Sequence, residues 1–153
     1  MIAYLDTSAL VKRYVAETGS AFITQMTHIA TGNEIWNTTI TCVEIIAAFY
    51  RRVRIGSLTS AEAASAEQNF RQDLHGVLLL WDVSPSILSQ AMALAKLHSL
   101  RAYDSIQLAT AVDLLTQRRH GNLPPVKFLS SDQVLNQAAL AEGLLVDDPN
   151  RYP

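Results

Sequence analysis

Short runs of consecutive apolar residues alternate along the chain with longer stretches in which apolar residues recur every three or four positions. Because the short runs do not alternate apolar with polar residues, they predict strands buried on both faces of a parallel sheet. These runs are Ile2 to Leu5, Val77 to Trp81, Val126 to Leu129 and Leu144 to Val146. Glu34 to Thr39 is a weaker candidate for a fifth strand.

The longer stretches have the spacing of amphipathic helices. They are Thr41 to Ile55, Ser60 to Leu74, Ser86 to Leu100, Asp104 to Gln117 and Asp132 to Glu142. Gly143 follows the last stretch, where glycine is a favoured helix stop. The order of elements predicts an α/β sandwich around a mostly parallel sheet, and 153 residues suit a single domain spanning 1–153.

Composition narrows the class of protein. Hydrophobic residues make up 49% and charged residues 17%, which is typical of a globular chain. The net charge of −2 argues against a broad basic surface for nucleic acid. Cys42 is the only cysteine, and no apolar run reaches the roughly 18 residues of a membrane span. We therefore expect a cytoplasmic protein that makes no membrane contact.

Acidic residues stand where strands give way to helices. Asp6 and Asp132 follow apolar runs directly or within a few residues, and Glu44 lies one helical turn beyond the weaker strand. Since the carboxyl ends of parallel strands meet at one edge of a sheet, these three acids are expected there. Asp104 follows a helix, so the pattern alone does not place it.

Helix capping is an alternative explanation for each acid alone. Asp6, Asp104 and Asp132 would open helices, and Thr41-x-x-Glu44 and Asp104-x-x-Gln107 have the spacing of capping boxes. Capping does not explain the small hydroxyl residues around the acids, which suit the orientation of carboxylates or metal-bound water. These are Thr7, Ser8, Ser105, Ser130 and Ser131.

If the fold gathers the four acids, they would form a site for a hard cation. Carboxylate oxygens are ligands that Mg²⁺ and Mn²⁺ prefer. Such a cation activates water and neutralises the charge on a phosphate during in-line displacement.

Other kinds of site have little support in the sequence. The four histidines lack the spacing of zinc ligands, and the chain has no Gly-rich phosphate loop or nucleophile elbow. Arg51, Arg52 and Arg54 close a predicted helix. They would either complement the helix dipole or contact a nucleic-acid backbone.

Three motifs resemble one family. The stretch Asp6-Thr7-Ser8-Ala9-Leu10-Val11-Lys12-Arg13-Tyr14 is similar to the opening of the PIN-domain ribonucleases, in particular the VapC toxins of type II toxin–antitoxin systems. Tyr103-Asp104-Ser105-Ile106-Gln107-Leu108-Ala109-Thr110-Ala111 resembles their second signature. Phe128-Leu129-Ser130-Ser131-Asp132, with the helix that follows it, resembles the third.

The resemblance implies a three-layer α/β/α sandwich with a five-stranded, mostly parallel sheet. It implies an endoribonuclease whose catalytic residues are Asp6, Glu44, Asp104 and Asp132, with Asp6 and Asp104 as the main ligands of Mg²⁺ and Mn²⁺ as a substitute. The implied partners are an RNA substrate, a cognate antitoxin and a second copy of the chain. Apolar surface on Ser60 to Leu74 and Ser86 to Leu100 also favours a homodimer.

Three alternatives remain. A phosphatase of the haloacid-dehalogenase kind also ends its first strand in Asp, but it needs a second acid where Ser8 stands. A Mg²⁺-binding phosphoacceptor receiver module needs an acid pair near the first strand, where only Asp6 stands. A catalytically inactive PIN-like binding protein is the third.

Overall fold

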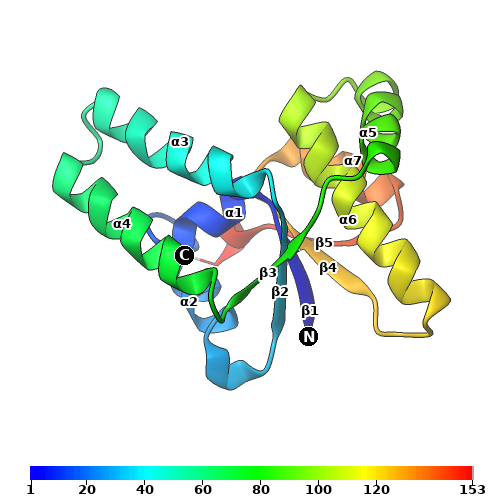
Figure 1. Cartoon of the computed structure of the whole chain (residues 1–153), viewed down its shortest axis with the longest axis horizontal. Coiled ribbons are helices and arrows are strands. Elements are labelled where there is room, and N and C mark those ends of the chain that lie inside the picture. The colour runs from blue at the N-terminus through cyan, green and yellow to red at the C-terminus, as the bar shows by residue number, and fades with distance from the viewer. Residues whose placement is uncertain (153) are drawn as a thin grey trace.

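A five-stranded parallel sheet forms the middle of the molecule in the computed structural model, which describes residues 1–152 (Figure 1). The strands are β1 (Ile2–Leu5), β2 (Glu34–Thr38), β3 (Leu78–Trp81), β4 (Val126–Leu129) and β5 (Leu145–Asp147). Their order across the sheet is β3-β2-β1-β4-β5, and every neighbouring pair is parallel. All five predicted strands are confirmed, including the weaker candidate.

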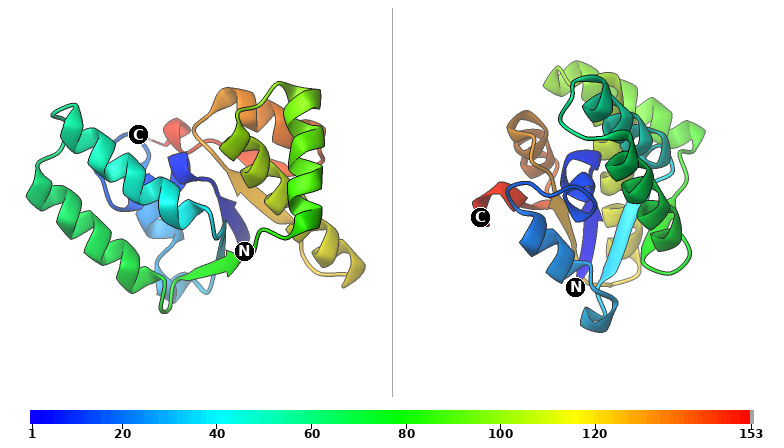
Figure 2. Two further views of the ribbon diagram at one scale, coloured as in Figure 1. Left: turned by 45° about the horizontal axis from the view of Figure 1, so that its top comes forward. Right: turned by 90° about the vertical axis from the view of Figure 1, so that its left-hand side faces the viewer.

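Helices cover both faces of the sheet (Figures 1 and 2). One face carries α1 (Thr7–Leu10), α2 (Ser20–Met26), α3 (Thr41–Arg54) and α4 (Ser60–Asp73). The other carries α5 (Pro85–His98), α6 (Ala102–His120) and α7 (Gln133–Ala141). Short 3-10 turns are η1 (Val11–Arg13), η2 (Ile29–Thr31) and η3 (Pro149–Arg151). The three-layer α/β/α sandwich is therefore confirmed.

The central strand β1 shows why its apolar run does not alternate. Ile2 and Tyr4 pack into the core beneath α5 to α7, whereas Ala3 and Leu5 pack into the core on the opposite face. All four side chains are buried, as expected for a strand covered on both sides.

The same expectation is wrong for the two edge strands. In β3, Leu79 and Leu80 are 40% and 39% exposed, and in β5 Leu145 is 54% exposed. These strands lie at the ends of the strand order, where the helical layers cover them incompletely. An apolar run does not reveal whether its strand is central or at an edge.

One helix boundary affects the site. The sequence places the start of a helix at Asp104, but α6 begins at Ala102 and its N-cap is Arg101. Asp104 therefore lies in the first turn of α6 instead of capping it.

The strand order creates a crevice next to β1. From β1 the chain builds the sheet outward through β2 to β3, and then returns to place β4 and β5 on the other side. Ligands of open α/β sheets bind beyond the carboxyl ends of the strands at such a reversal. Asp6 follows β1, and Asp132 follows β4. None of the helices within residues 1–152 has the length and apolarity that crossing a membrane requires.

Candidate active site

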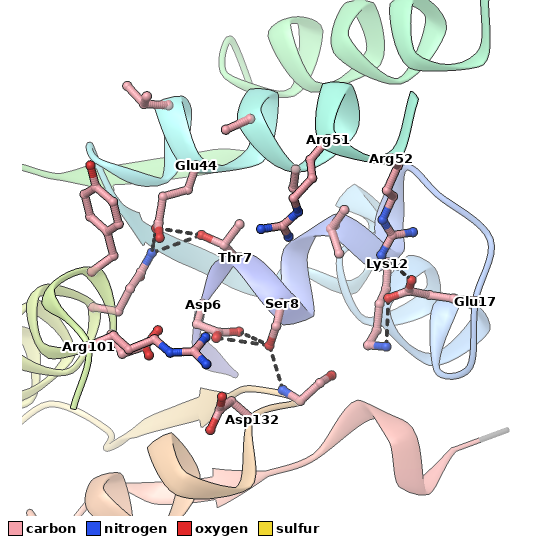
Figure 3. A pocket seen from close by; sticks show the side chains of 18 residues that line it. Asp6, Thr7, Ser8, Lys12, Glu17, Glu44, Arg51, Arg52, Arg101 and Asp132 are labelled. Atoms are coloured by element: carbon pink, nitrogen blue, oxygen red, sulfur yellow. Dashed lines mark hydrogen bonds and ion pairs between the residues drawn. The ribbon is translucent and has the colours of Figure 1, made fainter. Parts of the chain in front are cut away.

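A pocket of about 510 Å³ lies at this crevice and brings together all four predicted acids, Asp6, Glu44, Asp104 and Asp132. Figure 3 shows Asp6 at the end of β1, with Glu44 reaching in from α3 and Asp132 from the loop after β4. Asp104 enters from α6, the placement that the sequence pattern left open.

Asp6 is the most buried of these acids, with 4% of its surface exposed. Its Oδ1 caps α1 by accepting a hydrogen bond from the Ala9 N–H at 2.9 Å. The Ser8 hydroxyl donates to Oδ1 at 2.8 Å, and the Ser130 hydroxyl donates to Oδ2 at 3.0 Å. The carboxylate is thus fixed by groups from both sides of the crevice.

The same two hydroxyls also hold the loop after β4. Ser8 Oγ accepts a hydrogen bond from the Ser131 N–H at 2.8 Å, and Ser130 Oγ accepts one from the Asp132 N–H at 3.0 Å. Each hydroxyl uses its proton for Asp6 and its lone pair for the loop. The predicted role of Ser8 and Ser130 in orienting an acid is confirmed at the level of geometry.

Burial raises the pKa of Asp6 to about 7, and the nearby charge of Asp104 adds to the rise, although the hydrogen bonds from Ala9, Ser8 and Ser130 oppose it. Among the described residues no cationic side chain forms an ion pair with Asp6. A cation next to this carboxylate would stabilise its charged form further.

Asp104 is half-buried and makes no side-chain hydrogen bond to any other residue of the described chain. Burial raises its pKa, the charges of Asp132 and Glu44 raise it further, and Arg101 opposes them. The carboxylate is therefore available for a ligand and is surrounded by like charges.

Asp132 is the N-cap of α7, and its Oδ1 accepts a hydrogen bond from the Leu135 N–H at 2.9 Å. No hydrogen bond to its Oδ2 is found in the described part of the chain. One oxygen thus serves the helix and the other remains for the pocket.

Glu44 does not cap a helix, so the predicted capping box with Thr41 is wrong. The N-cap of α3 is Ile40, which makes no side-chain capping bond. Glu44 Oε2 instead accepts hydrogen bonds from Thr7 Oγ1 at 2.8 Å and from Gln107 Nε2 at 2.5 Å. The capping box expected from Asp104 to Gln107 is also wrong, because α6 begins two residues earlier.

The remaining hydroxyl residues differ from one another. Thr7 orients Glu44, as predicted. Ser105 donates its hydrogen bond to the Ala102 carbonyl of its own helix at 2.7 Å, and Ser131 Oγ is buried without a partner in the described structure. The expectation that these two orient carboxylates is therefore wrong.

Basic residues form part of the pocket wall. Arg51 reaches from α3 and Arg101 precedes α6, and neither has an ion-pair partner within residues 1–152 (Figure 3). Arg52 pairs with Glu17 at 2.6 Å, and Glu17 also pairs with the buried Lys12 at 2.9 Å. The arginine run thus has separate roles, which the sequence could not distinguish.

The donor chemistry suits a hard cation, because the pocket gathers carboxylate and hydroxyl oxygens around an unneutralised buried acid. The four acids do not converge on one point, however. Within the described residues, no three His, Cys, Asp or Glu side chains lie close enough together to ligate one ion. This favours an ion that takes one or two carboxylates and keeps several waters, as Mg²⁺ does.

Two kinds of comparison show which known proteins this chain is similar to. Ribonuclease VapC45 of Mycobacterium tuberculosis is 28% identical over 111 residues, which are 72% of this chain and 75% of that protein. The chain is thus similar in sequence to a VapC ribonuclease. No protein-family profile matches it.

Solved structures share the fold of this chain over nearly its whole length. PAE2754 from Pyrobaculum aerophilum superposes with a TM-score of 0.63 at 16% identity, covering 99% of this chain and 91% of that one. VapBC2 from Rickettsia felis, bound to a promoter DNA fragment, gives 0.61 at 14% identity over 97% and 98%. A toxin–antitoxin complex from Klebsiella pneumoniae gives 0.57 at 18% identity over 96% and 97%.

The observed strand order also argues against the receiver alternative. Receiver modules have the order 2-1-3-4-5, whereas this chain has β3-β2-β1-β4-β5. The phosphatase alternative needs an acid two residues after Asp6. Ser8 stands there and donates its hydrogen bond to Asp6.

Two residues that reach the acids indirectly do not stand out in the sequence. The local pattern presents Gln107 only as part of a helix cap and Tyr4 only as part of an apolar run. Both are buried, and the Tyr4 hydroxyl donates to Gln107 Oε1 at 2.8 Å. A tyrosine in a strand covered on both faces was the available signal, because a buried hydroxyl needs a partner.

Proposed function

We propose that this chain is a Mg²⁺-dependent endoribonuclease that acts as the toxin of a toxin–antitoxin pair. The observation that carries the proposal is the pocket at the β1–β4 crevice, which is lined by four acids and in which Asp6 is buried without a cationic partner among the described residues. Sequence similarity to Ribonuclease VapC45 supports RNA as the substrate. The fold shared with the Klebsiella toxin–antitoxin complex supports an antitoxin as partner.

Asp6 and Asp104 would hold the metal ion, with Mn²⁺ able to replace Mg²⁺. Burial raises both pKa values, and the charge of Asp104 adds to the rise at Asp6. A divalent cation held by the two carboxylates would favour their charged forms. Bound there, Mg²⁺ would supply neutralisation of phosphate charge and a lower pKa for the attacking water.

Glu44 and Asp132 would orient the attacking water. Each has one oxygen fixed by the protein and a second with no hydrogen bond from the described residues. Such an oxygen can accept the proton of the water while the water oxygen bonds to phosphorus and the bond to the leaving ribose oxygen breaks. Arg51 and Arg101 would contact neighbouring phosphates of the RNA backbone.

Cleavage of RNA by the purified protein tests the proposal. Asp6→Asn and Asp104→Asn should each abolish cleavage, because both changes keep the shape of the side chain and remove its charge. Asp82→Asn, which alters an exposed acid outside the pocket, is the matched control and should retain full activity. Chelation of divalent ions should stop the parent protein, and added Mg²⁺ should restore it.

Two results would contradict the proposal. Full activity of either pocket variant, with contaminating nuclease excluded by the control preparation, would reject the assignment of these acids. Absence of cleavage by the parent protein, combined with tight binding of an antitoxin from the adjacent reading frame, would favour the inactive PIN-like binding protein instead.

A further inference from the structure

We propose that Gln107 is a positioning residue that holds Glu44 in place for the reaction, and that Tyr4 fixes the orientation of the Gln107 amide. The inference rests on the proposed endoribonuclease function, because it assigns a role that acts through Glu44. The residues form a chain of hydrogen bonds from Tyr4 on the central strand β1, through Gln107 on α6, to Glu44 on α3.

Gln107 lies in the second turn of α6 and is 2% exposed. Its Nε2 donates to Glu44 Oε2 at 2.5 Å and to Thr41 Oγ1 at 2.9 Å. The Thr7 hydroxyl donates to the same Glu44 oxygen at 2.8 Å. One oxygen of Glu44 is thus held by two donors from two different elements.

The other end of the amide is held just as firmly. The Tyr4 hydroxyl donates to Gln107 Oε1 at 2.8 Å, and the tyrosine ring is stacked on Phe128 with 5.7 Å between centroids. Because an amide oxygen has no proton to offer, the Tyr4 hydroxyl is the donor in this contact.

These two contacts leave the amide a single acceptable orientation. A flipped amide would point its oxygen at the Glu44 carboxylate, which is a repulsive contact, and would take from the Tyr4 hydroxyl proton the acceptor that it has in Oε1. Both changes are costly in a buried region. Glu44 and Tyr4 together thus favour the orientation in which Gln107 presents a donor to Glu44.

The arrangement is more than a way of satisfying buried polar groups. An apolar side chain of similar size would fill the same space without needing partners, as Leu108 does at the neighbouring buried position. The Gln107 amide instead donates hydrogen bonds to Glu44 and Thr41. The second oxygen of Glu44 receives no hydrogen bond from the described residues. Gln107 therefore restricts an acid that would otherwise rotate about three side-chain bonds.

A double-mutant cycle on RNA cleavage tests this role. Gln107→Met keeps the volume and removes the amide, and we expect kcat to fall at least ten-fold with KM changed less than two-fold. Tyr4→Phe should give a smaller loss in kcat. The Glu44→Gln variant must retain measurable residual activity for the cycle. In that variant, adding Gln107→Met should lower kcat by less than a further two-fold, because the carboxylate that Gln107 positions is already absent.

Thr27→Val serves as the control for the loss of a buried polar group. Thr27 is 2% exposed and lies outside the pocket, so this variant should keep the parent kcat whatever its effect on melting temperature. If Gln107→Met and Glu44→Gln multiply their losses, or if Gln107→Met changes KM alone, Gln107 has only a structural role and the inference fails.

A second readout does not depend on RNA cleavage. In a ¹⁵N-labelled protein, the side-chain NH₂ signals of Gln107, assigned with Gln107→Met, should include one proton shifted strongly downfield by its hydrogen bond to a carboxylate. Glu44→Gln should remove that shift, and Tyr4→Phe should broaden the pair. An unshifted pair, insensitive to Glu44→Gln, would overturn the inference even if the parent protein cleaves RNA. A parent protein without activity, but with the shifted signal, would overturn the proposed function alone.

Discussion

The burial of Asp6 should make the metal-free protein less stable as the pH rises toward neutrality. The pKa of Asp6 is raised from 3.8 to about 7 in the fold. The folded state therefore binds a proton that the unfolded state has already released between these two values. By linkage, the resulting stabilisation is fully present below the unfolded pKa and is lost as the pH rises through the folded pKa.

The raised pKa sets the size of the effect. A shift of roughly 3 pH units corresponds to about 4 kcal/mol between the two limits of pH. Between pH 5 and pH 7 the loss in the free energy of unfolding is about 2 kcal/mol, which lowers the melting temperature of a domain of this size by about 4–8 °C.

The measurement is thermal melting of the parent protein and of Asp6→Asn at pH 5 and pH 7, in chelator. Asparagine keeps the capping geometry, and both proteins share every other titrating group. The difference between their pH slopes therefore isolates Asp6. At pH 7, Mg²⁺ at about 100 times its dissociation constant should stabilise the parent by about 2.7 kcal/mol and the variant much less. Equal pH slopes in chelator would refute the reasoning, because burial would then not oppose the charge on Asp6.

Three further predictions follow from the surface and from one tight packing contact. Arg51→Ala and Arg101→Ala should each raise the KM for RNA several-fold and reduce the slope of log K against log salt by about one, whereas Arg54→Ala should not. The exposed leucine and methionine side chains on α5 favour a homodimer, which light scattering at micromolar concentration should detect. Gly19→Ala should melt well below Gly32→Ala. Both glycines have positive φ, but a Cβ at Gly19 would clash with the carbonyl oxygen of Pro149, whereas one at Gly32 would meet nothing within 4 Å.

The fold could be predicted from the sequence wherever the signal is local. Continuous apolar runs give the strands, and helical spacing gives most of the helices, because both patterns depend on neighbours within a few residues. The exposure of Leu79 and Leu80 could not be predicted in this way. It depends on the position of β3 at the end of the strand order, which only the whole sheet determines.

The residues of the site likewise differ in how far local sequence patterns predict their positions. The strand ends predicted that Asp6 and Asp132 would meet at one edge, because parallel strands share a direction. Asp104 could be placed only through the resemblance to a family, since it arrives from a helix. The link from Tyr4 through Gln107 to Glu44 joins residues 103 and 63 positions apart, and no spacing rule describes such contacts.

From the sequence, each acid could be either a helix cap or a functional residue of the pocket. The structure shows that one carboxylate can be both. A carboxylate has two oxygens, and a helix N-terminus needs only one of them. Asp132 caps α7 with Oδ1 and leaves Oδ2 toward the pocket. Asp6 caps α1 with Oδ1 and accepts hydrogen bonds from the hydroxyls of Ser8 in α1 and Ser130 in the loop after β4. The cap fixes the direction of the second oxygen, so a helix that begins at the end of a strand is a means of aiming a carboxylate. Asp104 and Glu44 lack such caps, and of these two only Glu44 has a replacement, the amide of Gln107.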